Sequence, residues 1–77
     1  MQIKMYTKSY CSYCFAAKQL LAQKGLEFEE IPLLGNPEAE KEMRALTNGY
    51  TVPQILIDGR PIGGYTELAA LNKAGRL

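Results

Sequence analysis

The spacing of apolar and polar positions divides the chain into seven predicted elements. Ile3 and Met5 alternate with more polar neighbours, which is the period of a strand that lies in a sheet. The full predicted order is strand 2–7, helix 11–24, strand 26–31, helix 37–49, strand 52–57, strand 61–62 and a last helix that ends by residue 75. Strands that alternate with helices in this way predict an α/β fold.

Local end signals support these boundaries. Gly25 follows the first helix as a C′ glycine, and Asn36 before Pro37 is typical of a helix start. Asp58-Gly59 separates two strand-like runs and predicts a two-residue hairpin turn. Seven apolar side chains are expected in the core, namely Met5, Phe28, Leu46, Ile55, Ile57, Leu68 and Leu71.

The order of the elements predicts a mixed four-stranded sheet with helices on both faces. Each of the two strand–helix–strand units implies parallel pairing of its strands, whereas the hairpin adds an antiparallel edge. We expect the 77 residues to form one domain, residues 1–77. An α/β sheet places its site at the carboxyl ends of its strands, which here means residues 8–14.

Composition and charge exclude several classes of function. A net charge of +1 gives no long-range attraction to nucleic acid or to a membrane surface. The chain has no histidine, which excludes an imidazole base, a Cys–His nucleophile and a Cys₂His₂ metal site. It also has neither a signal-peptide-like start nor a run of about 20 apolar residues, so we expect a cytoplasmic protein.

The only two cysteines, Cys11 and Cys14, lie two residues apart where the first helix is predicted to begin. Unpaired N–H groups and the positive end of the helix dipole favour the thiolate there, and the thiolate is the form that attacks a disulfide. Cys11 is expected to be the nucleophile and Cys14 the resolving thiol. The pattern therefore predicts thiol–disulfide exchange.

Two other interpretations of the cysteine pair stay open from the residues alone. A structural disulfide would close a very short loop, and short loops gain least from cross-linking. A metal site would need ligands from a second molecule, because two cysteines cannot supply the four thiolates of a zinc or iron–sulfur site.

Three motifs in order resemble the glutaredoxin family over nearly the whole chain. They are the active-site stretch from Tyr6 through Cys11-Ser12-Tyr13-Cys14, the segment Thr51-Val52-Pro53, and the pair Gly63-Gly64 before the last helix. The resemblance implies a thioredoxin-like fold, no tightly bound cofactor, and glutathione as co-substrate. It further implies a monomer that acts on disulfide-containing or glutathionylated proteins.

The resemblance also implies which residues contact glutathione. Pro53 would be a cis-proline that leaves the backbone N–H and C=O of Val52 free to pair with an extended peptide. Gly64 would allow the γ-glutamyl group to approach the backbone at the start of the last helix. The complete implied set is Lys8, Tyr13, Thr51, Val52, Pro53, Gly64, Tyr65 and Thr66.

Two positions depart from the family pattern. Ser12 stands where the family commonly has proline, and Thr66 stands where an aspartate typically meets the glutathione amine. Thr66 retains a hydroxyl that can cap the last helix, but the charge is lost. Two other functions therefore remain as alternatives: an NrdH-type electron donor reduced by thioredoxin reductase, and a dimer that binds a glutathione-ligated [2Fe–2S] cluster.

Overall fold

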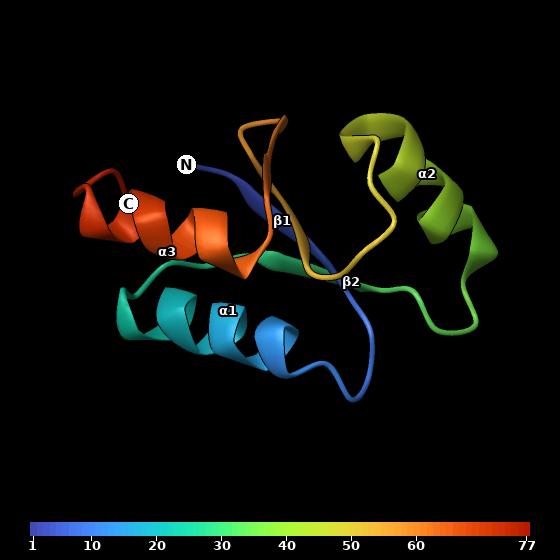
Figure 1. Ribbon diagram of the computed structural model, residues 1–77, viewed down its shortest axis with the longest axis horizontal. Coiled ribbons are helices and arrows are strands. Elements are labelled where there is room, and N and C mark those ends of the chain that lie inside the picture. Colours follow the sequence, from blue (N-terminus) through green and yellow to red (C-terminus); the bar gives the residue numbers. More distant parts are fainter.

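The computed structural model describes residues 1–77 and contains seven elements in the predicted order (Figure 1). Their bounds lie within a few residues of the predicted ones for every element. They are β1 (Ile3–Thr7), α1 (Ser12–Gln23), β2 (Glu29–Pro32), α2 (Pro37–Thr47), β3 (Gln54–Ile57), β4 (Arg60–Gly63) and α3 (Tyr65–Lys73).

The four strands form one mixed sheet in the order β2-β1-β3-β4. β1 pairs parallel with β2, as predicted from the first strand–helix–strand unit. The prediction of parallel pairing for the second unit is wrong, because β3 lies antiparallel beside β1 with Gln54 opposite Tyr6. After α2, residues 48–53 lead the chain back to the carboxyl end of β1, so β3 starts there and runs the other way.

Both faces of the sheet are covered, and each helps to form its own core cluster. α1 and α3 cover one face, and α2 lies on the other side (Figure 1). Successive β1 residues point to opposite faces, so Met5 packs below α1 while Tyr6 packs below α2. The first cluster contains Ile3, Met5, Ala17, Leu21, Ile55 and Leu68, and the second contains Tyr6, Leu33, Ala39, Met43 and Leu56.

One polar contact fastens α2 to the sheet. The buried Tyr6 hydroxyl donates a hydrogen bond to the Glu42 carboxylate, and Lys4 lies 3.8 Å from the same carboxylate. Burial of the phenol, together with this hydrogen bond, raises the pKa of Tyr6 well above its ordinary value. Tyr6 therefore stays protonated and keeps its role as a donor.

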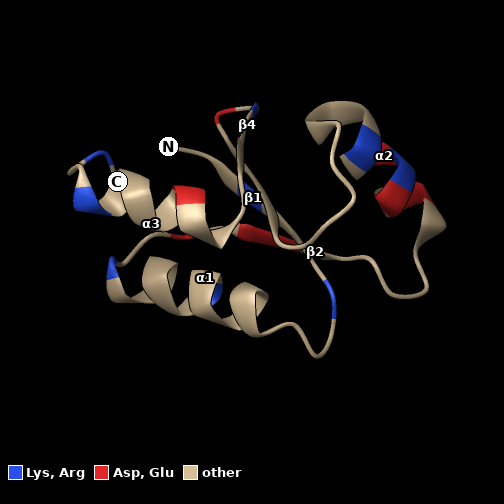
Figure 2. Ribbon diagram, viewed as in Figure 1, with Lys and Arg blue, Asp and Glu red and all other residues tan.

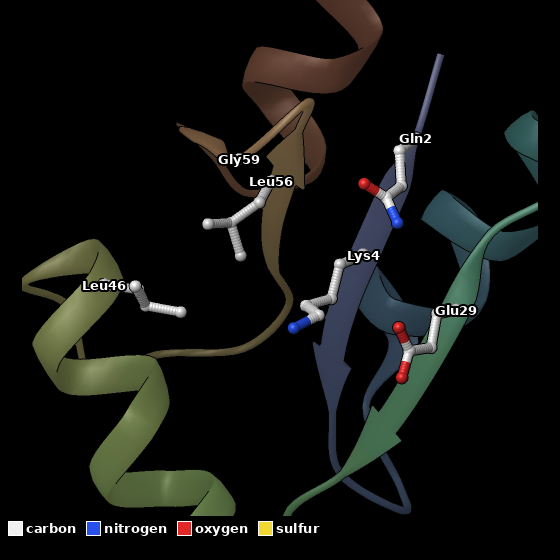
Figure 3. A pocket seen from close by; sticks show the side chains of 6 residues that line it. All are labelled: Gln2, Lys4, Glu29, Leu46, Leu56 and Gly59. Atoms are coloured by element: carbon white, nitrogen blue, oxygen red, sulfur yellow. The ribbon is translucent and has the colours of Figure 1, made fainter.

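The predicted core is correct for Met5, Ile55 and Leu68, which are fully buried. Phe28, Ile57 and Leu71 are half-buried. Leu46 is 47% exposed, so its assignment to the core is wrong. The last turn of α2 stands off from the sheet, and Leu46 there faces a hollow instead of closely packed neighbours (Figure 3).

The turns and caps follow the predicted chemistry with one exception. Asp58 and Gly59 have φ angles of 51° and 82°, which are the positive values of a type I′ hairpin turn. Thr66, expected as a helix cap, is instead the second residue of α3. Gly64 is the N-cap, and its N–H donates to Glu67 Oε1 at 2.7 Å.

Acidic and basic residues lie close together along α2 (Figure 2). The longest helix, α1, has 12 residues, and no helix reaches the length and hydropathy required to cross a bilayer.

Candidate active site

The two cysteines lie at the start of α1, where the chain leaves the carboxyl end of β1. Cys11 is the N-cap, with an extended φ of −115°, and Cys14 lies in the first helical turn. They are joined as a disulfide with a Cα–Cα distance of 5.2 Å. Cys14 is only 2% exposed, whereas Cys11 is partly exposed, so an incoming thiol or disulfide reaches Cys11 first.

The start of the helix provides the electrostatic environment of the Cys11 sulfur. The Cys14 backbone N–H points at Cys11 Sγ with an N–S distance of 3.1 Å, and the first turn of α1 contains no acidic residue. Both features favour negative charge on this sulfur once the disulfide is reduced. Cys11 therefore has the geometry of an accessible nucleophile, and Cys14 is a buried second thiol next to it.

The loop that precedes β3 reaches the same sulfur. The Val52–Pro53 peptide bond is cis, as the resemblance implies, and the Val52 carbonyl oxygen lies 3.7 Å from Cys11 Sγ. Neither the N–H nor the C=O of Val52 takes part in a backbone hydrogen bond. The Val52 N–H therefore has no partner, and the Val52 C=O contacts only the Cys11 sulfur.

A groove of about 370 Å³ runs from this loop to the start of α3, and a volume of this size is typical of small-molecule sites. It brings together seven of the eight residues predicted to contact glutathione. The lining consists of Tyr13, Thr51, Val52, Pro53, Gly64, Tyr65, Thr66 and Glu67.

Two contacts shape the groove. The rings of Tyr13 and Tyr65 stack with their centroids 6.1 Å apart, which joins α1 to α3 along one wall. A Cβ atom on Gly64 would lie 3.2 Å from the Pro53 carbonyl oxygen. Because this spacing is tight for a side chain, glycine at position 64 lets the start of α3 approach the Pro53 loop closely.

Lys8, the eighth predicted residue, does not line this groove. It lines a second hollow on another flank of Cys11, formed by Lys8, Ser9, Tyr10, Cys11, Ser12, Cys14, Phe15 and Lys18. Its predicted contact with the glycine carboxylate of glutathione therefore stays a prediction.

Sequence reasoning missed Glu67, which lines the groove and caps α3. Its signal was present, since a glutamate three residues after an N-cap is the acidic half of a capping box. The prediction placed the N-cap at Thr66 instead of Gly64, and this shift hid the pattern.

A polar network beneath the site was also missed. The buried Thr7 hydroxyl donates to Glu30 Oε2 at 2.7 Å, and Lys18 Nζ lies 3.0 Å from the same oxygen. The hydrogen bonds from Thr7 and then from Lys18 lower the pKa of Glu30. The network ties the end of β1 to β2 and α1, the three elements that support the active-site loop.

A third hollow, drawn in Figure 3, lies on the side of the sheet that faces α2. It is lined by Gln2, Lys4, Glu29, Leu46, Leu56 and Gly59, and it contains neither cysteine. No three metal-ligating side chains gather in the chain, so a cluster would need ligands from other molecules.

Comparisons with known proteins agree with this geometry. The family model for glutaredoxin matches residues 3–62. Glutaredoxin 3 of Escherichia coli K12 is 45% identical over 75 residues, which is 97% of this chain and 90% of the relative. A glutaredoxin of Pseudomonas aeruginosa is 44% identical over 75 residues, 97% of this chain and 89% of that protein.

Solved structures share the fold. The solution structure of a glutaredoxin from Brucella melitensis matches with a TM-score of 0.82 and 41% identity, covering 99% of this chain and 83% of that one. The crystal structure of a buckwheat glutaredoxin–glutathione complex matches with a TM-score of 0.87 and 28% identity, covering 97% and 71%. The predicted thioredoxin-like fold is confirmed. With its partly exposed Cys11 and buried Cys14, this chain belongs to the glutaredoxin family of thiol–disulfide oxidoreductases.

Proposed function

We propose that this protein uses glutathione to reduce protein–glutathione mixed disulfides and protein disulfides. The observation that carries the proposal is the groove beside Cys11, which is lined by both Val52 and the start of α3. Glutathione is an extended tripeptide with a carboxylate at each end. Free backbone polar groups and a helix N-terminus are the groups that bind such a ligand. The buckwheat relative with bound glutathione supports this assignment.

Each part of the groove has a proposed role. Val52 exchanges backbone hydrogen bonds with the cysteine residue of glutathione, as a neighbouring strand would. The N–H groups in the first turn of α3, at Tyr65 and Thr66, meet the γ-glutamyl carboxylate, because the Gly64 N–H is already bonded to Glu67. Thr66 lies exposed beside them and accepts a hydrogen bond from the ammonium group. Tyr13 covers the ligand from the side of α1, and Thr51 supports the Val52 loop.

The monothiol reaction needs only Cys11. Its thiolate attacks the glutathione sulfur of a mixed disulfide, forming a Cys11–glutathione disulfide and releasing the protein thiolate, which takes a proton from water. A second glutathione thiolate then attacks the glutathione sulfur bound to Cys11. Glutathione disulfide leaves, and the Cys11 thiolate is restored.

Protein disulfides follow the dithiol route, in which Cys14 completes the exchange. Cys11 forms a mixed disulfide with the substrate, and the Cys14 thiolate then attacks Cys11 Sγ and releases the second substrate thiolate. The product is the Cys11–Cys14 disulfide. Two glutathione molecules reduce it and leave as glutathione disulfide.

Two variants test the proposal in a glutathione-coupled assay with glutathione reductase. Cys11→Ser should abolish both activities, because the accessible thiolate at the helix start is lost. Cys14→Ser should keep the reduction of glutathionylated protein while the reduction of protein disulfides falls at least about tenfold. Reduction of the wild-type disulfide by thioredoxin reductase but not by glutathione would contradict the proposal and favour the NrdH-type alternative.

A further inference from the structure

The second hollow beside Cys11 has a composition of its own. Apart from the cysteines, its lining carries two aromatic rings, Tyr10 and Phe15, and two lysines, Lys8 and Lys18. It lies on the surface of the loop before α1 and of the first turns of α1, whereas the groove proposed for glutathione lies between α1, the Val52 loop and α3. Both flanks of Cys11 therefore carry two aromatic rings, but the groove has one carboxylate, Glu67, whereas the hollow has two lysines.

The backbone of Tyr10 has a conformation that is unfavourable for a tyrosine. It has a φ of 60°, in the left-handed region that bulky side chains rarely adopt, and its side chain is fully exposed. Phe15, one helical turn after Cys11, is 61% exposed. Neither ring contributes packing that would offset its exposure, and backbone strain of this kind gathers at functional sites. The free rings are available to a partner.

The charges of the hollow are of one sign. Lys8 takes part in no ion pair, and Lys18 is held in place by Glu30. No carboxylate lines the hollow. A partner segment that combines an apolar side chain with an acidic one would complement the rings and Lys8, the cation of the hollow that has no ion-pair partner.

We propose that this hollow docks the polypeptide next to the reacting cysteine of a protein substrate, and that it favours a bulky apolar and an acidic neighbour of that cysteine. The inference rests on the proposed function. Glutathione carries one residue on each side of its cysteine, and seven of its eight predicted contacts lie in the groove. A protein segment bound through Cys11 continues past the sulfur and reaches Tyr10 and Phe15.

An exchange equilibrium on Cys11 tests this inference without turnover. The Cys14→Ser variant is first converted to its Cys11–glutathione disulfide and then mixed with a peptide thiol. The products are the Cys11–peptide disulfide and free glutathione, so no other reductant takes part. One peptide places Phe and Glu beside its cysteine, and the matched peptide places Gly and Lys there. The equilibrium constants are read by mass spectrometry.

We expect the Phe/Glu peptide to be favoured about eightfold, which corresponds to burying roughly 50 Å² of apolar surface. Added to the Cys14→Ser background, Tyr10→Asn or Phe15→Ala should reduce the preference to about twofold or less. Tyr50→Asn is the matched control, because Tyr50 is 74% exposed and lines neither hollow, and it should leave the preference unchanged. This comparison also cancels the difference in intrinsic thiol acidity between the peptides.

The outcomes separate the two proposals. If no Cys11–glutathione disulfide forms, the proposed function is wrong. If it forms and the peptides are bound equally, or Tyr50→Asn removes as much preference as Tyr10→Asn, the docking inference is wrong. Sedimentation of the wild type and of Tyr10→Asn completes the test, since a dimer that Tyr10→Asn dissociates would assign the rings to self-association instead.

Discussion

Replacing Thr66 by aspartate tests whether the start of α3 faces the glutathione amine. Thr66 is the second residue of α3, is exposed, and lines the groove together with Val52. A carboxylate there would pair with the ligand's ammonium group in contact with water. Exposed ion pairs contribute about 0.2–1 kcal/mol, so the KM for a glutathionylated substrate should fall about 1.4- to 5-fold.

The same substitution should slightly stabilise the fold, because a negative charge at a helix N-terminus contributes about 0.3–1 kcal/mol. The neighbouring Glu67 carboxylate repels the new charge, so we expect the lower end of this range and a rise in Tm of roughly 1–3 °C. These two effects are separable, since only the first requires the ligand.

The assay measures KM for Thr66→Asp and for Thr66→Asn at low and high salt. The asparagine variant has nearly the same shape without the charge and should show no gain. The gain of the aspartate variant should shrink at high salt, where exposed charges are screened. An unchanged KM in a Thr66→Asp protein whose Tm has risen would show that the side chain does not face the ligand.

Three further changes test the scaffold. Gly63→Ala should lower the free energy of unfolding in urea by about 1–3 kcal/mol, because Gly63 has a φ of 111° and a Cβ there would lie 2.6 Å from Glu67 Oε1; an unchanged stability would contradict this. Thr7→Val should cost about 1 kcal/mol at pH 7 by removing the hydroxyl that donates to Glu30. Because the pKa of Glu30 is lowered on folding, its contribution exists above the ordinary value of 4.5 and is lost as the pH falls through the lowered pKa. The cost should therefore shrink in unfolding measured near pH 3, and an equal cost at both pH values would refute the role of Glu30. Leu21→Ala, at a fully buried position, should lower stability by about 2–5 kcal/mol in the same experiment, and a loss below about 1 kcal/mol would show that this core is not closely packed.

Local pattern was sufficient for the elements of the fold but not for the direction of every strand. The alternation of Ile3 and Met5 and the turn at Asp58-Gly59 are local signals, and both predictions are confirmed. The direction of β3 depends on the path of residues 48–53, and the spacing of apolar residues does not predict that path. Leu46 has helical spacing from Met43, yet its burial depends on how closely α2 approaches the sheet.

The site, too, could be predicted from the sequence only in part. The spacing of Cys11 and Cys14 predicted the chemistry, and the family resemblance supplied seven of the eight residues that line the groove, all except Glu67. The hydrogen bonds that Glu30 accepts from Thr7 and from Lys18 join residues on three elements, and only the folded chain brings them together. Lys8 follows the first strand as expected, but its place on another flank of Cys11 depends on the path of the loop.

The strand order leaves β2 and β4 as the two outer strands, and both are poor templates for a foreign strand. β2 ends in Pro32 after two exposed glutamates, and β4 begins with the exposed pair Arg60 and Pro61. Proline offers no N–H to a new partner, and the charges resist being covered. Both outer strands of this four-stranded sheet are therefore protected against edge-to-edge aggregation. We propose the backbone of Val52, next to the Cys11 sulfur, as the place where an extended chain binds instead.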